Sequence, residues 1–151
     1  MRIAAVKYFD IADGDGVRTA IFVSGCRRHC KGCHNKIAWD FNFGELFSEK
    51  LEFNILKSLE PEYIAGLSIL GGEPFEPENE IALIPFLKKV HKNIWIYTGF
   101  KFTEIQHRDL TQYADVIVDG EFILEQRDIS LAFRGSRNQN IIRLQDSFEI
   151  C

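Results

Sequence analysis

The sequence predicts a domain of the α/β class built on a mostly parallel β-sheet. Short runs rich in β-branched and aromatic residues alternate with helical patterns along the 151 residues, which is typical of βαβ units. Hydrophobic residues make up 46% of the chain, enough to bury a core between a sheet and its helices. No flexible linker or internal repeat interrupts this pattern. We therefore expect one domain over residues 1–151.

Five strands are expected, at residues 18–24, 67–70, 94–97, 116–118 and 141–144. The first ends at Gly25 and runs directly into a cysteine-rich loop. The next three end at the turns 71–74, 98–99 and 119–120. Because ligands gather beyond the carboxyl ends of parallel strands, we expect these four loops to converge on one rim.

Helical patterns separate these strands. Ser48 can cap a helix that runs to about Leu59. A second helical segment covers about 78–92 and contains Pro85, so we expect a kink or two helical pieces there. Thr103 and Gln106 have capping-box spacing, which predicts a short third helix.

Three of the four cysteines, Cys26, Cys30 and Cys33, lie within one loop at x3 and x2 spacing. Three thiolates can hold one face of a small metal centre and leave one coordination position open to a ligand. We interpret this loop as the site of a [4Fe–4S] cluster in which three irons are held by cysteine and the fourth is free.

A structural zinc site completed by His29 or His34 is the alternative interpretation of this loop. It is disfavoured because zinc sites usually pair two separated ligand turns, and no second turn is visible in the sequence. Cys151 could supply a fourth thiolate, but a chain terminus is a poorly held ligand. The two histidines are expected to be neighbours of the ligands or ordinary loop residues.

The second candidate motif is Gly71-Gly72-Glu73-Pro74 at the end of an expected strand. Two glycines let the backbone approach a ligand closely, and the Glu73 carboxylate can pair with an ammonium group. By itself this motif is better explained by an ordinary strand-to-helix turn. Its predicted position beside the cysteine loop favours a binding function.

Other polar residues allow two interpretations. The segment 13–16 resembles a hairpin turn, although its two carboxylates also have the x1 spacing of calcium loops. Asp119 can be a turn carboxylate or a ligand, and Tyr97 a core aromatic or a site residue. The role of Thr98 is likewise open. The polar segment 135–139 can be a surface loop, or can bind a nucleoside or a partner.

Composition and charge argue against several classes of protein. The chain has 18 basic and 22 acidic residues, a net charge of −4, which argues against nucleic-acid binding. No run of 18 apolar residues is present, and the first residues do not form a signal peptide. We therefore expect no membrane contact and a cytoplasmic location, where thiols stay reduced and clustered cysteines bind metals.

These motifs resemble the radical S-adenosylmethionine (SAM) superfamily, and within it the activases of glycyl-radical enzymes. The resemblance is closest to the group that acts on anaerobic (class III) ribonucleotide reductase. Gly32, which precedes the third cysteine, fits that group, because many other members carry an aromatic residue there. The segments that carry the resemblance are 13–18, 22–26, 30–35, 71–74, 96–100, 118–120 and 135–139.

The resemblance implies an incomplete TIM-like barrel of the radical SAM type, since 151 residues are too few for a full barrel. It also implies two cofactors, the [4Fe–4S] cluster and SAM. Cys26, Cys30 and Cys33 would bind the cluster. The SAM-binding residues would be Gly32, Cys33, His34, Gly71, Gly72, Glu73 and Pro74.

The implied reaction removes a hydrogen atom from a glycine of the reductase and needs no acid–base residue of this chain. The implied partners are anaerobic ribonucleotide reductase and a low-potential electron donor such as flavodoxin. An activase of the pyruvate formate-lyase type and an iron–sulfur electron carrier without SAM chemistry are the alternatives.

Overall fold

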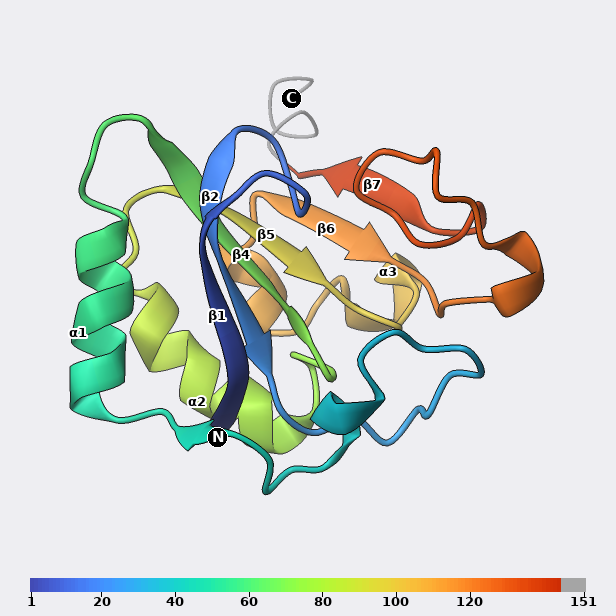
Figure 1. The fold of residues 1–151 in the computed structure, drawn as a ribbon, viewed down its shortest axis with the longest axis horizontal. Helices are drawn as coiled ribbons and strands as arrows, with labels where there is room; N and C mark the ends of the chain where they lie inside the picture. Colours follow the sequence, from blue (N-terminus) through green and yellow to red (C-terminus); the bar gives the residue numbers. More distant parts are fainter. Residues whose placement is uncertain (145–151) are drawn as a thin grey trace.

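Seven strands form one open sheet. The structure is a computed structural model that describes residues 1–144. The strands are β1 (Arg2–Asp10), β2 (Val17–Val23), β3 (Glu45–Leu46), β4 (Ile64–Gly71), β5 (Asn93–Tyr97), β6 (Val116–Asp119) and β7 (Asn140–Arg143). Their order across the sheet is β3-β1-β2-β4-β5-β6-β7. Figure 1 shows the twisted sheet with the loop that follows β2 and the long segment before β7 at the same end.

The expectation of a mostly parallel sheet in an incomplete TIM-like barrel is wrong. The pairs β2–β4, β4–β5 and β5–β6 are parallel, whereas β1–β2, β1–β3 and β6–β7 are antiparallel. The sheet is therefore mixed, and its two edges are β3 and β7. The reason is the connections: a parallel pair needs a long crossover, but only residues 11–16 join β1 to β2. Residues 120–139 join β6 to β7 with one short 3₁₀ turn and no crossover helix.

All five expected strands are present, as β2, β4, β5, β6 and β7, and the predicted hairpin turn lies between β1 and β2. The sequence did not predict β1 or β3. Along β1 only Ile3 is buried, so this strand lacks the apolar run that marks the central strands. Strands of this kind carry a weak sequence signal because little of their surface enters the core.

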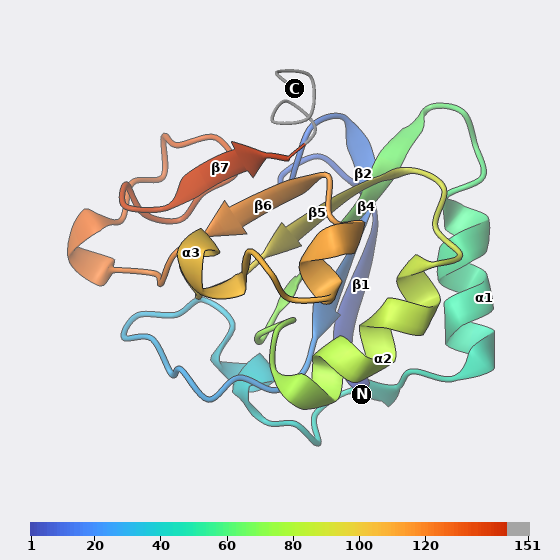
Figure 2. The same cartoon turned by 180° about the vertical axis from the view of Figure 1, so that it is seen from behind.

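Three α-helices accompany the sheet in the described chain: α1 (Glu49–Ser58), α2 (Pro77–Leu87) and α3 (Phe102–Ile105). Short 3₁₀ turns lie at η1 (Lys36–Trp39), η2 (Leu110–Tyr113) and η3 (Leu124–Gln126). Figure 2 shows α2, α3 and η2 lying over one face of the sheet. The main core contains aliphatic residues of the sheet together with residues of α1 and α2, such as Ile55, Leu83 and Phe86.

The predicted cap of α1 is confirmed, since Ser48 Oγ accepts a hydrogen bond from the Leu51 N–H at 3.2 Å. The second helix was expected to kink or split, but α2 runs without interruption through Pro85. Both Pro85 and Ile81, whose carbonyl loses its helical partner, lie on the exposed side, where water can bind that carbonyl. The short third helix that was predicted is present as α3.

The expected capping box of α3 is displaced by two residues. Glu104, rather than Gln106, accepts a hydrogen bond from the backbone N–H of Lys101, at 2.8 Å. The helix therefore begins at Phe102, and the spacing of Thr103 and Gln106 was coincidental. The displacement is small and leaves the adjacent turn at Thr98–Gly99 unaffected.

A buried arginine holds the β1–β2 turn against the sheet. The Arg18 side chain is 1% exposed, and its Nε donates to Ser68 Oγ at 2.8 Å. Its Nη1 donates to the Asp15 carbonyl at 2.9 Å, and the Ser68 hydroxyl donates to the Asp13 carbonyl at 2.5 Å. These bonds join the turn to β4 and so position Asp13 at the edge of the cavity described next.

Candidate functional site

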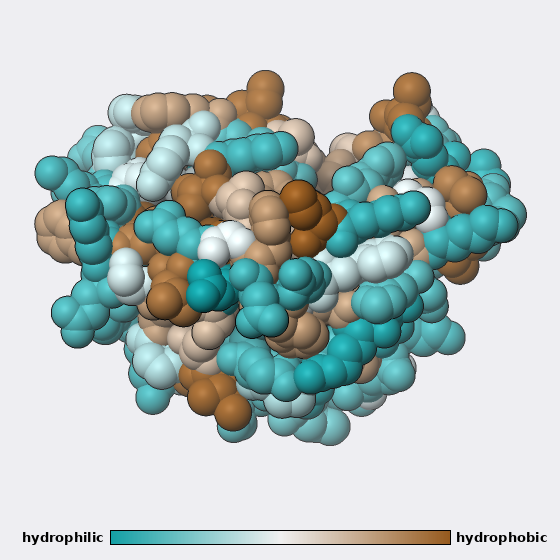
Figure 3. Space-filling model, turned by 60° about the horizontal axis from the view of Figure 1, so that its bottom comes forward, coloured by the Kyte–Doolittle hydropathy of each residue, from teal (hydrophilic) through white to brown (hydrophobic). Residues whose placement is uncertain are grey.

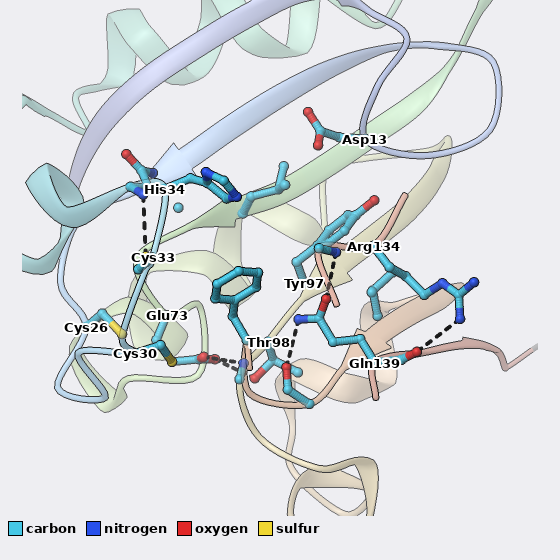
Figure 4. Close-up of a pocket in the computed structure, with 18 of the residues that line it drawn as sticks. Asp13, Cys26, Cys30, Cys33, His34, Glu73, Tyr97, Thr98, Arg134 and Gln139 are labelled. Carbon is cyan, nitrogen blue, oxygen red and sulfur yellow. Dashed lines mark hydrogen bonds between the residues drawn. The ribbon is translucent and has the colours of Figure 1, made fainter. Parts of the chain in front are cut away.

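One large cavity lies at the carboxyl ends of the parallel strands. Its volume is about 530 Å³, and its lining combines residues from all four loops that were expected to converge. These are the cysteine loop, the turn after β4, the turn after β5 and Gly120 after β6, so the predicted rim is confirmed. Figure 4 shows the three cysteines and Glu73 on one side of the cavity, and Arg134 and Gln139 on the other.

The surface around this end of the molecule is mixed. Figure 3 turns the lower end forward and shows hydrophilic and hydrophobic side chains interspersed, with a notch at the upper edge. The segment 121–139 contributes much of the remaining cavity wall, including Phe122, Ile129, Phe133 and Arg134. The sequence indicated a possible binding loop at residues 135–139 of this wall, and no motif indicated residues 121–134.

Backbone hydrogen bonds hold the start of the cysteine loop. The Gly25 N–H donates to the Ala38 carbonyl at 2.7 Å, and the Cys26 N–H to the Trp39 carbonyl at 3.1 Å. The next residue, Arg27, donates its backbone N–H to Glu76 Oε1 at 2.9 Å, and its guanidinium pairs with Glu76 and Glu78. Cys26 therefore sits on a backbone that is fixed from both sides.

Each of the three sulfurs has a backbone N–H group directed at it. The amides of Arg28 and His29 bond to the Cys26 sulfur, the amide of Phe122 to the Cys30 sulfur, and the Asn35 N–H to Cys33 Sγ at 3.4 Å. Such donors stabilise thiolates and the sulfurs of metal clusters. The loop is therefore prepared to receive a cation at all three cysteines.

Burial nevertheless keeps two of these thiols protonated in the protein without metal. It raises the pKa of Cys26, and it raises the pKa of Cys30 to about 11 with a further contribution from the nearby Glu121 carboxylate. Binding of a metal must therefore displace these protons.

The described residues contain no group of three or more His, Cys, Asp or Glu side chains arranged around a single metal ion. His29 stacks on Trp39, with ring centroids 4.2 Å apart, and His34 lies against Phe122 at 5.5 Å. A four-iron cluster attaches its cysteines to separate irons, so its thiolates need not converge on one point. The three cysteines on one cavity wall fit this donor set. Cys151 lies outside the described residues.

The two glycines of the 71–74 turn permit a close approach of the chain to itself. Gly71 has φ +120°, and a Cβ there would collide with the Val23 backbone. A Cβ on Gly72 would lie 2.8 Å from the Ala38 carbonyl oxygen. The Gly72 N–H donates to the Val23 carbonyl and the Glu73 N–H to the Gly25 carbonyl, both at 2.8 Å. The glycines thus join this turn to the start of the cysteine loop.

Glu73 is the buried carboxylate of the cavity. Glu73 is 2% exposed, and its Oε1 accepts hydrogen bonds from Thr98 Oγ1 at 2.6 Å and from the Phe75 N–H at 3.1 Å. Its Oε2 accepts from the Gly99 N–H at 2.8 Å. Burial raises the pKa of Glu73, while these donors and the charge of Arg28 oppose the rise. Pro74 is buried and is not among the residues that line the cavity.

The remaining candidates have mostly internal partners. Asp119 is 5% exposed; its Oδ2 accepts from the Phe102 N–H at 2.8 Å and its Oδ1 from the Asn140 N–H at 3.2 Å. Gln139 closes the 135–139 loop on itself and donates from Nε2 to the Gly120 carbonyl at 2.9 Å. The Tyr97 hydroxyl is different: it is buried at the cavity and has no hydrogen-bond partner within residues 1–144.

Comparison with known proteins identifies the family. The model of the 4Fe-4S single cluster domain matches residues 12–142. An anaerobic ribonucleoside-triphosphate reductase-activating protein of Haemophilus influenzae is 43% identical over 145 residues, covering 90% of this chain and 94% of the relative. The chain belongs to this family of activating proteins.

Two further members of the family support the assignment. The reductase-activating protein of Pasteurella multocida is 41% identical, covering 91% of this chain and 96% of the relative. That of Enterobacteria phage T4 is 36% identical and covers 87% of each chain. The resemblance to the activating proteins of anaerobic ribonucleotide reductase is therefore confirmed. Within residues 1–144, every helix is too short or too polar to cross a membrane.

The local structure explains why position 32 is a glycine. Its φ is +77°, and a Cβ would lie 2.8 Å from Leu124 Cδ1, because the cysteine loop packs on η3. It does not itself line the cavity, whereas its neighbours Cys33 and His34 do. The structure thus explains the absence of an aromatic residue before the third cysteine in this chain.

We expect Gly32→Ala to lower the free energy of unfolding by about 1–2 kcal/mol from backbone strain alone. Urea denaturation measures the loss, with exposed Lys31→Ala as the matched control. The double variant Gly32→Ala, Leu124→Ala should not recover the loss, since the positive φ remains. A Gly32→Ala protein as stable as the Lys31→Ala protein would contradict this account.

The raised pKa of Asp13 predicts that the stability of the folded protein depends on pH. This pKa is raised from 3.8 to about 7 by burial, then by a hydrogen bond to Asp10 and by the charge of Asp10, while Lys7 opposes the rise. Because the folded protein holds this proton more tightly than the unfolded chain, stability falls as the pH rises from about 4 to about 7. Above that range the loss is complete.

We expect Asp13→Asn to remove this loss, because an amide does not ionise. Relative to the unaltered protein, the variant should gain stability at about pH 8 and little at about pH 4, measured by urea midpoints. Exposed Asp109→Asn is the control and should leave the pH dependence unchanged. Parallel pH profiles for Asp13→Asn and the unaltered protein would refute the assignment.

Proposed function

We propose that this protein uses a [4Fe–4S] cluster and SAM to generate the glycyl radical of anaerobic ribonucleotide reductase. The observation that carries the proposal is the meeting of three cysteines and a buried carboxylate in one cavity at the strand ends. The relatives are named for activating this reductase, and the matching domain is a single-cluster 4Fe-4S domain.

In this proposal Cys26, Cys30 and Cys33 hold three irons, and the backbone amides directed at their sulfurs stabilise the bound thiolates. When bound and reduced, the cluster supplies one electron that cleaves SAM into methionine and a 5′-deoxyadenosyl radical, which takes a hydrogen atom from the target glycine.

Glu73 and the 71–72 backbone would receive the ammonium group of SAM. A buried carboxylate strengthens such a pair, because water is excluded from it. Among the described residues, Oε2 of Glu73 accepts one hydrogen bond, from the Gly99 N–H, so a lone pair remains for the ligand. The peptide groups around Cys33, from Gly32 to His34, would lie along the adenosine.

No acid–base residue is required, because the reaction moves a hydrogen atom rather than a proton. The chain would instead orient SAM and shield the radical from solvent within the cavity. A low-potential donor such as flavodoxin would supply the electron. The reducing cytoplasm is the compartment that suits this chemistry, since it keeps the three thiols free for iron.

Anaerobic reconstitution with iron and sulfide tests the proposal. Dithionite and SAM should then yield 5′-deoxyadenosine and methionine, and addition of the reductase should produce a glycyl signal in electron spin resonance. A reconstituted cluster that never cleaves SAM would make the protein an electron carrier. Cleavage with a signal only on a pyruvate formate-lyase type enzyme would reassign the partner.

A further inference from the structure

Arg28 is a cation of the cavity wall that has no anionic partner among residues 1–144. It lies in the loop between Cys26 and Cys30 and lines the cavity with them. Its guanidinium carbon stacks 4.2 Å from the centre of the Phe100 ring. Its Nε is buried and makes no hydrogen bond to the described residues. A buried donor without a hydrogen-bond partner costs free energy, so such a donor is expected to bind a ligand or another group.

The other arginines on this side of the molecule are engaged differently. Arg27 pairs with Glu76 and Glu78, and Arg108 pairs with Glu80. Arg134 also lines the cavity, but it donates to the Gln139 carbonyl, and Figure 4 shows it across the cavity from Glu73. The Nε of Arg134 is likewise buried without a partner among the described residues. Arg28 is therefore distinguished by its position beside the cysteines and Glu73.

Arg28 and Glu73 flank the same glycine. A Cβ placed on Gly99 would lie 2.8 Å from Arg28 Nε and 3.5 Å from Glu73 Oε2. The two side chains are thus close, yet they form no ion pair within 4.0 Å among the described residues. A carboxylate and a guanidinium stand next to one another on one wall, each with capacity for a further partner.

This arrangement is complementary to an α-amino-acid head group, which carries an ammonium and a carboxylate on one carbon. We propose that Arg28 binds the carboxylate of the methionine part of SAM while Glu73 binds its ammonium. Guanidinium suits this role because it is always charged and presents several N–H donors in one plane. The Phe100 ring holds that plane in place. The inference rests on the proposed function and adds a residue that determines ligand specificity.

The test compares SAM with decarboxylated SAM, which lacks the carboxylate and keeps the ammonium and sulfonium. Dissociation constants for both are measured anaerobically on the reconstituted protein, the Arg28→Met variant and the Arg28→Lys variant. Arg127→Met is the matched control, because Arg127 also lines the cavity and belongs to the 121–139 segment. Both ligands are measured on one preparation, so the ratio of their constants does not depend on how much protein holds a cluster.

Arg28→Met should weaken SAM binding about 10- to 100-fold and change binding of decarboxylated SAM less than about 2-fold. Arg28→Lys should recover part of the loss, and Arg127→Met should leave the ratio unchanged. If Arg28→Met weakened the binding of both ligands equally, Arg28 would have a structural role only. If the variant bound SAM more tightly, Arg28 would repel the ammonium group. Either result overturns the inference. If the unaltered protein cleaves SAM but replacement of Arg28 does not change the ratio of the two dissociation constants, only this inference is wrong. If the unaltered protein does not cleave SAM, the proposed function is wrong.

Discussion

Replacement of Cys30 by alanine is expected to abolish the cluster and the activity together. Cys30 occupies the middle of the loop, and its sulfur accepts a hydrogen bond from the Phe122 amide, which joins the cysteine loop to the 121–139 segment. Two thiolates cannot retain a cluster that three hold with an open iron. Iron and sulfide content should fall to background, and activity should fall by more than the roughly 10- to 100-fold cost of losing a residue that only supports a ligand.

Two controls make this prediction specific. Lys31→Ala changes an exposed residue of the same loop and should leave iron content and absorption intact. Cys151→Ala removes the fourth cysteine of the sequence and should also retain the cluster. Loss of iron in the Cys151→Ala protein, or a full cluster in the Cys30→Ala protein, would refute the three-cysteine assignment.

Replacement of Glu73 has two separable effects. Removal of its charge should weaken SAM binding by about 1.5–3 kcal/mol, the worth of a charged hydrogen bond. Removal of its oxygens should also destabilise the fold, because Thr98 Oγ1 and the amides of Phe75 and Gly99 lose their acceptor in a buried site. Each buried donor left without a partner costs about 1–3 kcal/mol.

Two variants distinguish these effects. Glu73→Gln keeps the size and one acceptor oxygen, so it should mainly weaken SAM binding. Glu73→Ala should weaken binding and in addition lower the urea midpoint. Both proteins should retain the iron–sulfur absorption, since Glu73 is not a cluster ligand. SAM binding of normal affinity in the Glu73→Gln protein would show that the ammonium binds elsewhere.

The structure changes the explanation of the 71–74 turn. The sequence suggested that the glycines open the backbone to a ligand, whereas Gly71 and Gly72 permit close contact with Val23 and Ala38 of the same chain. Glu73 lines the same cavity as the cysteines, and its two donors from the turn after β5 could not be predicted. These donors, Thr98 and Gly99, meet Glu73 only in the folded protein, and the third donor is the Phe75 N–H of the turn that contains Glu73.

Local patterns in the sequence determined strands β2, β4, β5, β6 and β7 and the capped helix α1. They also determined that the loops converge at the strand ends. They did so because strand and helix periodicity depend on nearby residues, and because parallel strands end at one edge. The cysteine spacing likewise determined the candidate metal ligands, since all three belong to one short loop.

Only the tertiary structure decided which way the outer strands run and what faces the cysteines. The antiparallel β1, β3 and β7 follow from short or helix-free connections, and they replace the expected partial barrel by an open mixed sheet. Arg28 beside Glu73, and Leu124 against Gly32, are contacts between distant segments. Such contacts depend on how the core packs, and no local pattern of residues encodes them.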